Sequence, residues 1–141
     1  MTKILGLDVG TKRIGVAISD ALLMFAQPNK VILRKSDEVA IDEIVLTCEQ
    51  NDISEIVVGL PKNMNGSIGP QAENCLEFGK LLENTLNLPV VFEDERLTSF
   101  QAEKLLAMQN KKYTKNKSMV DVTAAALILQ QNLDRRRINN G

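Results

Sequence analysis

The sequence predicts an α/β fold: a mixed five-stranded sheet, three antiparallel strands and then two parallel ones, flanked by helices. Three short β-rich segments come first with no helix between them, as in an antiparallel meander. Helical and strand-like periodicities then alternate, and strand-helix-strand crossovers place the later strands parallel to the first. The length of 141 residues suits a single domain, 1–141.

The predicted strands are apolar and rich in β-branched residues, and they span 3–9, 14–20, 31–33, 55–60 and 88–92. Residues 10–13 (GTKR) have the length and composition of a hairpin turn. Residues 26–29, which include Pro28, predict a loop before the third strand.

Apolar residues that recur at every third or fourth position predict helices at about 37–50, 70–86, 98–109 and 119–133. The third helix opens with a capping box, Thr98 to Gln101. Loops are expected at 61–69, which is rich in Gly and Asn, and at 110–117, which is rich in lysine. The tail, 135–141, is expected to fray.

The composition, with 44% apolar and 25% charged residues, matches an ordinary globular protein. No secretory signal and no apolar run near the ~18 residues of a membrane span is present, so a cytoplasmic location without membrane contact is expected. Cys48 and Cys75 lie on apolar helix faces without metal-ligand spacing, which predicts buried, reduced thiols. Because the chain has no histidine, catalysis would depend on carboxylates, lysine, hydroxyls or a hard metal ion.

Three acidic residues are candidates for chemistry. Asp8 interrupts an apolar strand, where an unpaired carboxylate is costly, although it could also cap the turn at Gly10. Asp94 and Glu95 end the fifth strand and should point to opposite faces; we favour Glu95 for the cleft shared with Asp8. The alternative is a solvated turn in which Arg96 forms an ion pair.

The third candidate, Asp121, begins an apolar helix, and its spacing from Ser118 also fits a capping box. Three acids at strand and helix ends, without histidine, favour Mg²⁺ or Mn²⁺ as the metal ion. Two such ions can activate water and stabilise the leaving oxygen of a phosphoryl displacement.

Basic residues adjoin these acids and could attract a polyanion such as RNA or DNA. The basic candidates are Lys12 and Arg13 beside Asp8, Arg96 beside Glu95, and Lys112 and Lys115 in the lysine-rich loop. The plainer interpretation is a set of solvated faces.

Four ordered blocks, residues 6–20, 58–69, 94–102 and 118–130, resemble the YqgF family, also called the RuvX-type Holliday junction resolvase family. The resemblance implies an RNase H-like fold and a cytoplasmic, Mg²⁺- or Mn²⁺-dependent nuclease. It implies Asp8, Glu95 and Asp121 as catalytic and metal-binding residues. It also implies a cleft loop in which Lys62, Asn65 and Gly66 contact backbone phosphate, although a turn-rich connection would look the same.

The same family resemblance implies processing of the 5′ end of the 16S rRNA precursor, with cleavage of four-way DNA junctions as the alternative. RNA is therefore favoured over junction DNA as the partner, and the chain is expected to be a monomer or a homodimer. A catalytically silent nucleic-acid-binding module would give the same sequence pattern. An actin-like ATP-binding protein would need a second domain, for which 141 residues leave no room.

Overall fold

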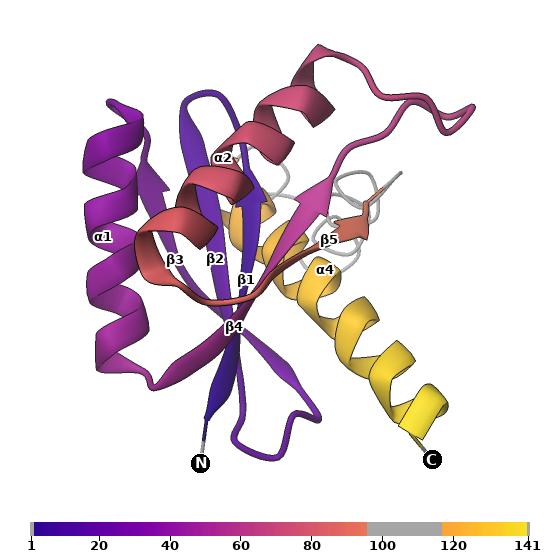
Figure 1. The fold of residues 1–141 in the computed structure, drawn as a ribbon. Coiled ribbons are helices and arrows are strands. Elements are labelled where there is room, and N and C mark those ends of the chain that lie inside the picture. The colour runs from indigo at the N-terminus through magenta and orange to yellow at the C-terminus, as the bar shows by residue number, and fades with distance from the viewer. Residues whose placement is uncertain (1, 96–116, 141) are drawn as a thin grey trace.

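A computed structural model describes residues 2–95 and 117–140, and Figure 1 shows the arrangement of the elements. In chain order these are β1 (Lys3–Val9), β2 (Arg13–Ser19), β3 (Ala26–Leu33), α1 (Asp37–Gln50), β4 (Ile53–Leu60), α2 (Pro70–Leu86), β5 (Val90–Asp94) and α4 (Lys117–Asn140). None of the helices in these residues combines the length and the apolar character that crossing a membrane requires. The helix predicted at 98–109 and most of the lysine-rich loop lie outside the described residues.

The five strands form one sheet in the order β3-β2-β1-β4-β5. β1 pairs antiparallel with β2, and β2 pairs antiparallel with β3. β1 and β4 are parallel, as are β4 and β5. The predicted mixed sheet is therefore confirmed, and its parallel strands β1, β4 and β5 end at the same edge.

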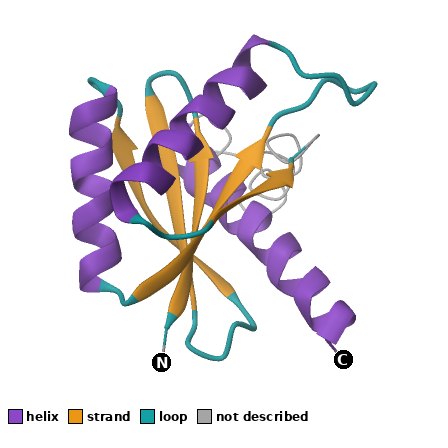
Figure 2. Cartoon of the chain, viewed as in Figure 1, coloured by secondary structure: helices purple, strands orange, loops and turns teal. Residues whose placement is uncertain are grey.

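Helices α1 and α2 cover one face of the sheet and α4 covers the other (Figure 2). Side chains alternate along β1, so Leu5, Leu7 and Val9 are buried in the core beneath α1 and α2. Cys48 and Cys75 are free thiols buried in the same core, which confirms that prediction. Burial raises the pKa of the Cys75 thiol to about 12, so this thiol is unreactive.

Glycines let α4 approach the opposite face closely. A Cβ added at Gly15 of β2 would lie 2.1 Å from the backbone oxygen of Asp121. One added at Gly6 of β1 would lie 2.7 Å from the Cβ of Leu129. The helix backbone therefore rests directly on the sheet, and this contact fixes where Asp121 lies.

Strand β3 is longer than predicted. It begins at Ala26 and pairs with β2 from Ser19 to Arg13, so the predicted loop at 26–29 is wrong. Pro28 is tolerated because β3 is an edge strand and because the register shifts between Val16 and Ala17.

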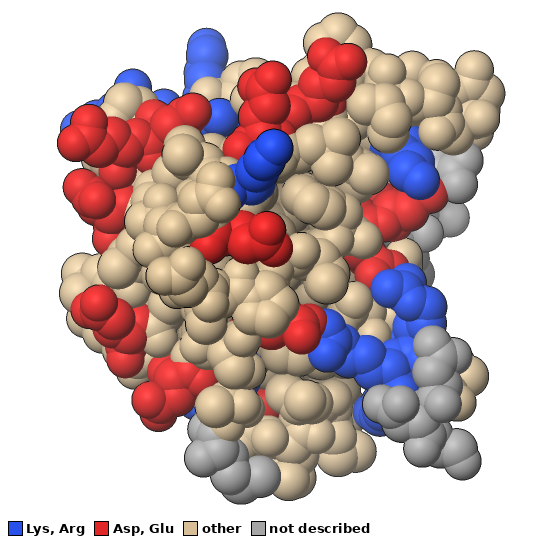
Figure 3. Space-filling model, in the orientation of Figure 1, with Lys and Arg blue, Asp and Glu red and all other residues tan. Residues whose placement is uncertain are grey.

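Helix α4 also differs from the prediction, because it continues to Asn140 through most of the tail that was expected to fray. Three consecutive arginines in this stretch have acidic partners: Arg135 pairs with Glu93, Arg136 with Glu55, and Arg137 with Asp134. Basic side chains gather along this end of the molecule in Figure 3. The first two ion pairs join the end of α4 to β5 and β4, which extends the helix beyond its apolar stripe.

Candidate active site

Asp8 lies on the face of β1 that α4 covers, in register with Gly15 of β2. The following turn is closed by backbone groups, since the N–H of Gly10 donates to the carbonyl oxygen of Arg13 at 2.9 Å. Asp8 interacts instead with two other carboxyl groups, those of Glu95 and Asp121.

Glu95 follows β5 directly, and its backbone N–H donates to the carbonyl oxygen of Leu60 at 3.2 Å. Its side chain is only 8% exposed and lies above Gly59, where an added Cβ would come within 2.8 Å of Oε2. Because side chains alternate along a strand, Glu93 and Glu95 point to the face of the sheet that α4 covers, and Asp94 points to the other face. The structure therefore brings Glu95 to Asp8, as the spacing of residues along β5 predicts.

The carboxyl groups of Asp8 and Glu95 are hydrogen-bonded to each other in a desolvated place. Burial, followed by the charge of Asp121, raises the pKa of Asp8 to about 6, against the effect of the hydrogen bond from Glu95. Burial, followed by the charge of Asp8, raises the pKa of Glu95 to about 9. Glu95 thus keeps a proton at neutral pH and donates it to Asp8, because two adjacent carboxylates repel each other unless a proton or a cation lies between them.

This pair should make the protein less stable as the pH rises. Both pKa values are raised by folding, so the folded protein binds more protons than the unfolded chain between about pH 4 and pH 9. The stabilisation from the shared proton is complete below about pH 4 and is lost as the pH passes through the two raised values. We expect the free energy of unfolding of the wild type to fall by about 1–3 kcal/mol relative to Glu95→Gln between about pH 5 and pH 8.

Urea unfolding followed by circular dichroism in the presence of a chelator measures this difference. Taking the difference between the two proteins cancels the contributions of other groups, such as Asp20. Parallel pH profiles for wild type and Glu95→Gln would show that the two carboxyl groups are not coupled.

Asp121 lies in α4 and is held by an arginine from β2. The Nε of Arg13 donates to Oδ2 of Asp121 at 2.8 Å. Helix α4 already includes Lys117 and Ser118, and the capping box expected at Ser118 stays a prediction. Asp121 is near enough to raise the pKa of Asp8, but its carboxylate is directed to Arg13.

The three predicted metal ligands therefore lie in one region without forming a closed cage. Among the described residues, no group of three Cys, Asp or Glu side chains is arranged to hold a metal ion. The chemistry of the donors still fits a hard cation: Asp8 and Glu95 offer only oxygen atoms, and their mutual repulsion favours a bound positive charge. In this structure the carboxylate of Asp121 belongs instead to the ion pair with Arg13.

A hollow of about 330 Å³ borders this region and is lined by Gly10, Thr11, Lys12, Arg13 and Asp121. It contains two of the predicted nucleic-acid contacts, the exposed Lys12 and the half-buried Arg13. Three other predicted contacts, Arg96, Lys112 and Lys115, lie outside the described residues. Residues of the β1–β2 turn and two cationic side chains thus share one hollow with Asp121.

The loop after β4 contains the remaining predicted contacts. Asn65 accepts hydrogen bonds from the backbone N–H of Ser67 at 3.0 Å and from its hydroxyl at 2.6 Å. Gly66 has a φ of 87°, a conformation that favours glycine, and its N–H donates to the carbonyl of Asn63. Asn65 and Gly66 therefore shape the turn, whereas Lys62 is a half-buried cation two residues after β4.

Glu93 was not among the predicted residues, although it is 1% exposed and lies two positions before Glu95 on the same strand face. Both of its oxygens accept from Arg135, each at 2.5 Å, and Gln131 and Asn132 donate to it as well. Burial opposes its ionisation, but these hydrogen bonds lower the pKa of Glu93 below its ordinary range. Glu93 thus anchors α4 beside the site, and its period-two spacing from Glu95 was the available sequence signal.

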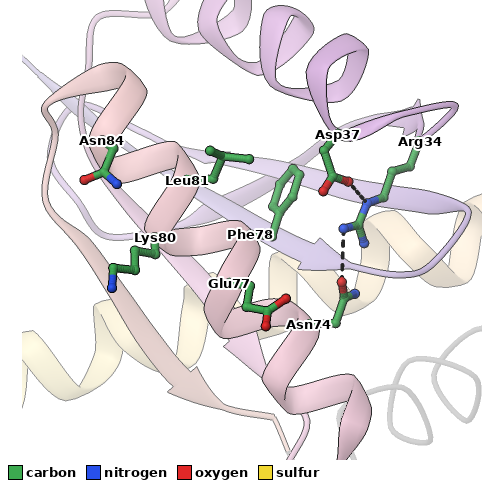
Figure 4. Close-up of a pocket in the computed structure, with 8 residues that line it drawn as sticks. All are labelled: Arg34, Asp37, Asn74, Glu77, Phe78, Lys80, Leu81 and Asn84. Carbon is green, nitrogen blue, oxygen red and sulfur yellow. Dashed lines mark hydrogen bonds and ion pairs between the residues drawn. The ribbon is translucent and has the colours of Figure 1, made fainter.

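Arg34 is a second residue that the sequence did not reveal, and it supports the β1–β2 turn from behind. Its Nη1 donates to the carbonyl of Gly10 at 2.9 Å, and its Nε pairs with Asp37 at 2.8 Å. Figure 4 shows it pointing toward Asp37 and Asn74, and its guanidinium lies 4.7 Å from the ring centre of Phe78. A hollow of about 360 Å³ opens there between α1 and α2, on the opposite side of the sheet from Asp8 and Glu95.

Comparison with known proteins matches almost the whole chain to the family that the sequence blocks resemble. A family model described as "RuvX: Holliday junction resolvase" matches residues 2–135. A protein of Caldanaerobacter subterraneus subsp. tengcongensis named "Putative pre-16S rRNA nuclease" is 50% identical over 139 residues, which cover 96% of this chain and 98% of the relative. A protein of Clostridium kluyveri with the same name is 46% identical over 133 residues, covering 94% and 97%.

Solved structures share the fold at low sequence identity. Thermus thermophilus RuvC in complex with a Holliday junction substrate gives a TM-score of 0.63 at 12% identity, covering 97% of this chain and 96% of RuvC. The fowlpox virus resolvase in a Holliday junction complex gives 0.58 at 10% identity, covering 96% and 99%. These likenesses confirm the expected RNase H-like fold class.

Proposed function

Because the chain belongs to the RuvX family of Holliday junction resolvases, we propose that it is a Mg²⁺- or Mn²⁺-dependent nuclease that hydrolyses phosphodiester bonds. Its proposed role is to process the 5′ end of the 16S rRNA precursor in the cytoplasm, in keeping with the names of its close relatives. The observation that carries the proposal is the pairing of the half-buried Asp8 with the buried Glu95, close to Asp121, which lines a hollow together with Lys12 and Arg13.

In this proposal Asp8, Glu95 and Asp121 hold the metal, and an ion bound there would activate a water molecule and stabilise the charge of the leaving oxygen. Lys12 and the backbone of the β1–β2 turn bind the substrate's backbone phosphate. Arg34 keeps that turn in place through the carbonyl of Gly10. No side chain has to act as a nucleophile, which suits a site built from carboxylates.

Depleting the protein from cells tests the proposed role directly. We expect 16S rRNA precursors with extended 5′ ends to accumulate, and we expect wild-type protein, but not Asp8→Asn, to restore mature ends. Primer extension or end sequencing measures the 5′ ends. Normal rRNA ends after depletion would refute the processing role.

Cleavage of four-way DNA junctions is the second candidate, because the matching family is described by that activity. Such an enzyme should act as a symmetric dimer that engages two strands, whereas an RNA-processing enzyme can act as a monomer. Purified protein assayed on a precursor transcript and on a four-way junction, together with its mass in solution, distinguishes the two. Mg²⁺-dependent cleavage of the junction alone, by a dimer, would favour the second candidate.

A further inference from the structure

The ion pair between Arg13 and Asp121 joins two residues that the proposed function uses in different ways. They lie 108 positions apart in sequence, and their side chains are 31% and 21% exposed. Both line the hollow at the β1–β2 turn, together with Gly10, Thr11 and Lys12. The pair therefore faces the hollow in which the proposed function places the substrate's phosphate.

Asp121 cannot direct the same oxygen fully to Arg13 and to a metal ion. Oδ2 accepts from the guanidinium at 2.8 Å, and in this arrangement the described acidic side chains do not form a metal cage. A guanidinium binds carboxylates and phosphates with similar geometry, because its N–H groups form a planar fork. The β1–β2 turn next to Arg13 is fixed by its own backbone bond and by Arg34, so Arg13 is placed to change partners without a change of fold.

We propose that Arg13 is a positioning residue that exchanges Asp121 for a backbone phosphate of the substrate, so that Asp121 becomes available to the metal when nucleic acid binds. This inference rests on the proposed function, since it takes Asp121 as a metal ligand. Exchange makes the two binding events mutually dependent: nucleic acid raises the affinity for the metal, and by linkage the metal raises the affinity for nucleic acid. Arg13 thus opposes binding of the metal ion when nucleic acid is absent and attracts the nucleic acid itself.

Titration of Mn²⁺ into the protein without nucleic acid, followed by electron paramagnetic resonance, tests whether Arg13 competes with the metal for Asp121. We expect Arg13→Met to bind Mn²⁺ about three- to tenfold more tightly than the wild type, because the competitor for Asp121 is gone. Arg13→Lys, which keeps the charge but loses the fork, should fall between them. Lys12→Met is the matched control: it removes the neighbouring cation from the same hollow, and we expect less than about a twofold change.

A short oligoribonucleotide with a non-cleavable backbone tests whether bound nucleic acid raises the affinity of the protein for the metal. It should tighten Mn²⁺ binding by the wild type but not by Arg13→Met, which should itself bind the oligonucleotide more weakly. A variant with tighter metal binding and weaker nucleic-acid binding is the signature of exchange, because loss of a structural contact would weaken both. In an Asp121→Asn background, Arg13→Met should no longer change the affinity for Mn²⁺.

Equal Mn²⁺ affinities of folded Arg13→Met and Lys12→Met would overturn the exchange while leaving the proposed nuclease intact. Weaker Mn²⁺ binding by both Arg13→Met and Arg13→Lys would overturn it as well. If the wild type bound no Mn²⁺, or bound it no better than Asp8→Asn, the proposed function itself would fail. The two failures are therefore distinguishable in one set of titrations.

Discussion

Replacing Asp8 by asparagine is expected to lower the rate of phosphodiester cleavage by about a thousandfold or more, while binding of nucleic acid is kept or strengthened. Asparagine fills the same space, so the fold should be retained. It removes the charge that would hold a cation and that accepts the proton from Glu95. Loss of a metal ligand removes several kcal/mol of transition-state stabilisation, and each 1.4 kcal/mol is about tenfold in rate. Glu95→Gln and Asp121→Asn should have effects of the same kind.

Asp94→Asn provides the matched control for these variants. It removes one negative charge from the residue next to Glu95, on the strand side that faces away from α4. We expect it to cleave within about threefold of the wild type, since Asp94 is half-buried on the other side of the strand and its charge is the weakest of the influences on Glu95. Single-turnover cleavage of a labelled precursor in Mg²⁺, in Mn²⁺ and in chelator measures all four variants. Full cleavage by Asp8→Asn would show that Asp8 holds no catalytic metal, whereas binding without cleavage by the wild type would support the silent binding module.

Gly15→Ala is expected to reduce the free energy of unfolding by at least about 2–3 kcal/mol, although alanine is usually the better residue of the two in a β-strand. On propensity alone the substitution would stabilise the protein by about 0.4–1 kcal/mol. The added Cβ, however, would lie 2.1 Å from the backbone oxygen and 2.6 Å from the carbonyl carbon of Asp121. Backbone cannot rotate away as a side chain can, so α4 has to move. That displacement should also take Asp121 from Arg13.

Gly69→Ala is the comparison variant, because the added Cβ would meet only the side chain of Asn63, at 3.3 Å. We expect a cost of about 1 kcal/mol or less, from placing alanine at the N-cap of α2. Urea unfolding curves give both values. A Gly15→Ala protein as stable as the wild type would mean that α4 does not rest on β2.

The sequence predicted the parts of the structure that depend on periodicity. Alternation along β1 and β5 was enough to place Asp8 and Glu95 on a common face, because a strand has a side-chain period of two. The edge strand β3 was missed around Pro28, since the sequence does not show which strand lies at an edge or where a bulge absorbs a proline. The end of α4 was missed because its arginines have partners on distant strands.

The sequence predicted which residues gather at the candidate site, but it did not predict which side chains pair with each other there. Aspartate near the start of the last helix looked like a cap, and only the fold brings Arg13 to Asp121 across 108 positions. The same holds for Arg34, whose importance lies in a bond to the carbonyl of Gly10 that no residue pattern reveals. Ion pairs between distant elements depend on the packing of α4 against glycines, which is a property of the three-dimensional structure.

A crystal structure of the protein soaked in Mn²⁺, with the ion located by its anomalous scattering, tests most directly whether these carboxyl groups hold the metal. We expect Mn²⁺ to bind between Asp8 and Glu95, with Asp121 as a further ligand when a non-cleavable oligonucleotide is present. Mn²⁺ bound elsewhere, with Asp8 and Glu95 still hydrogen-bonded to each other at saturating metal, would contradict it.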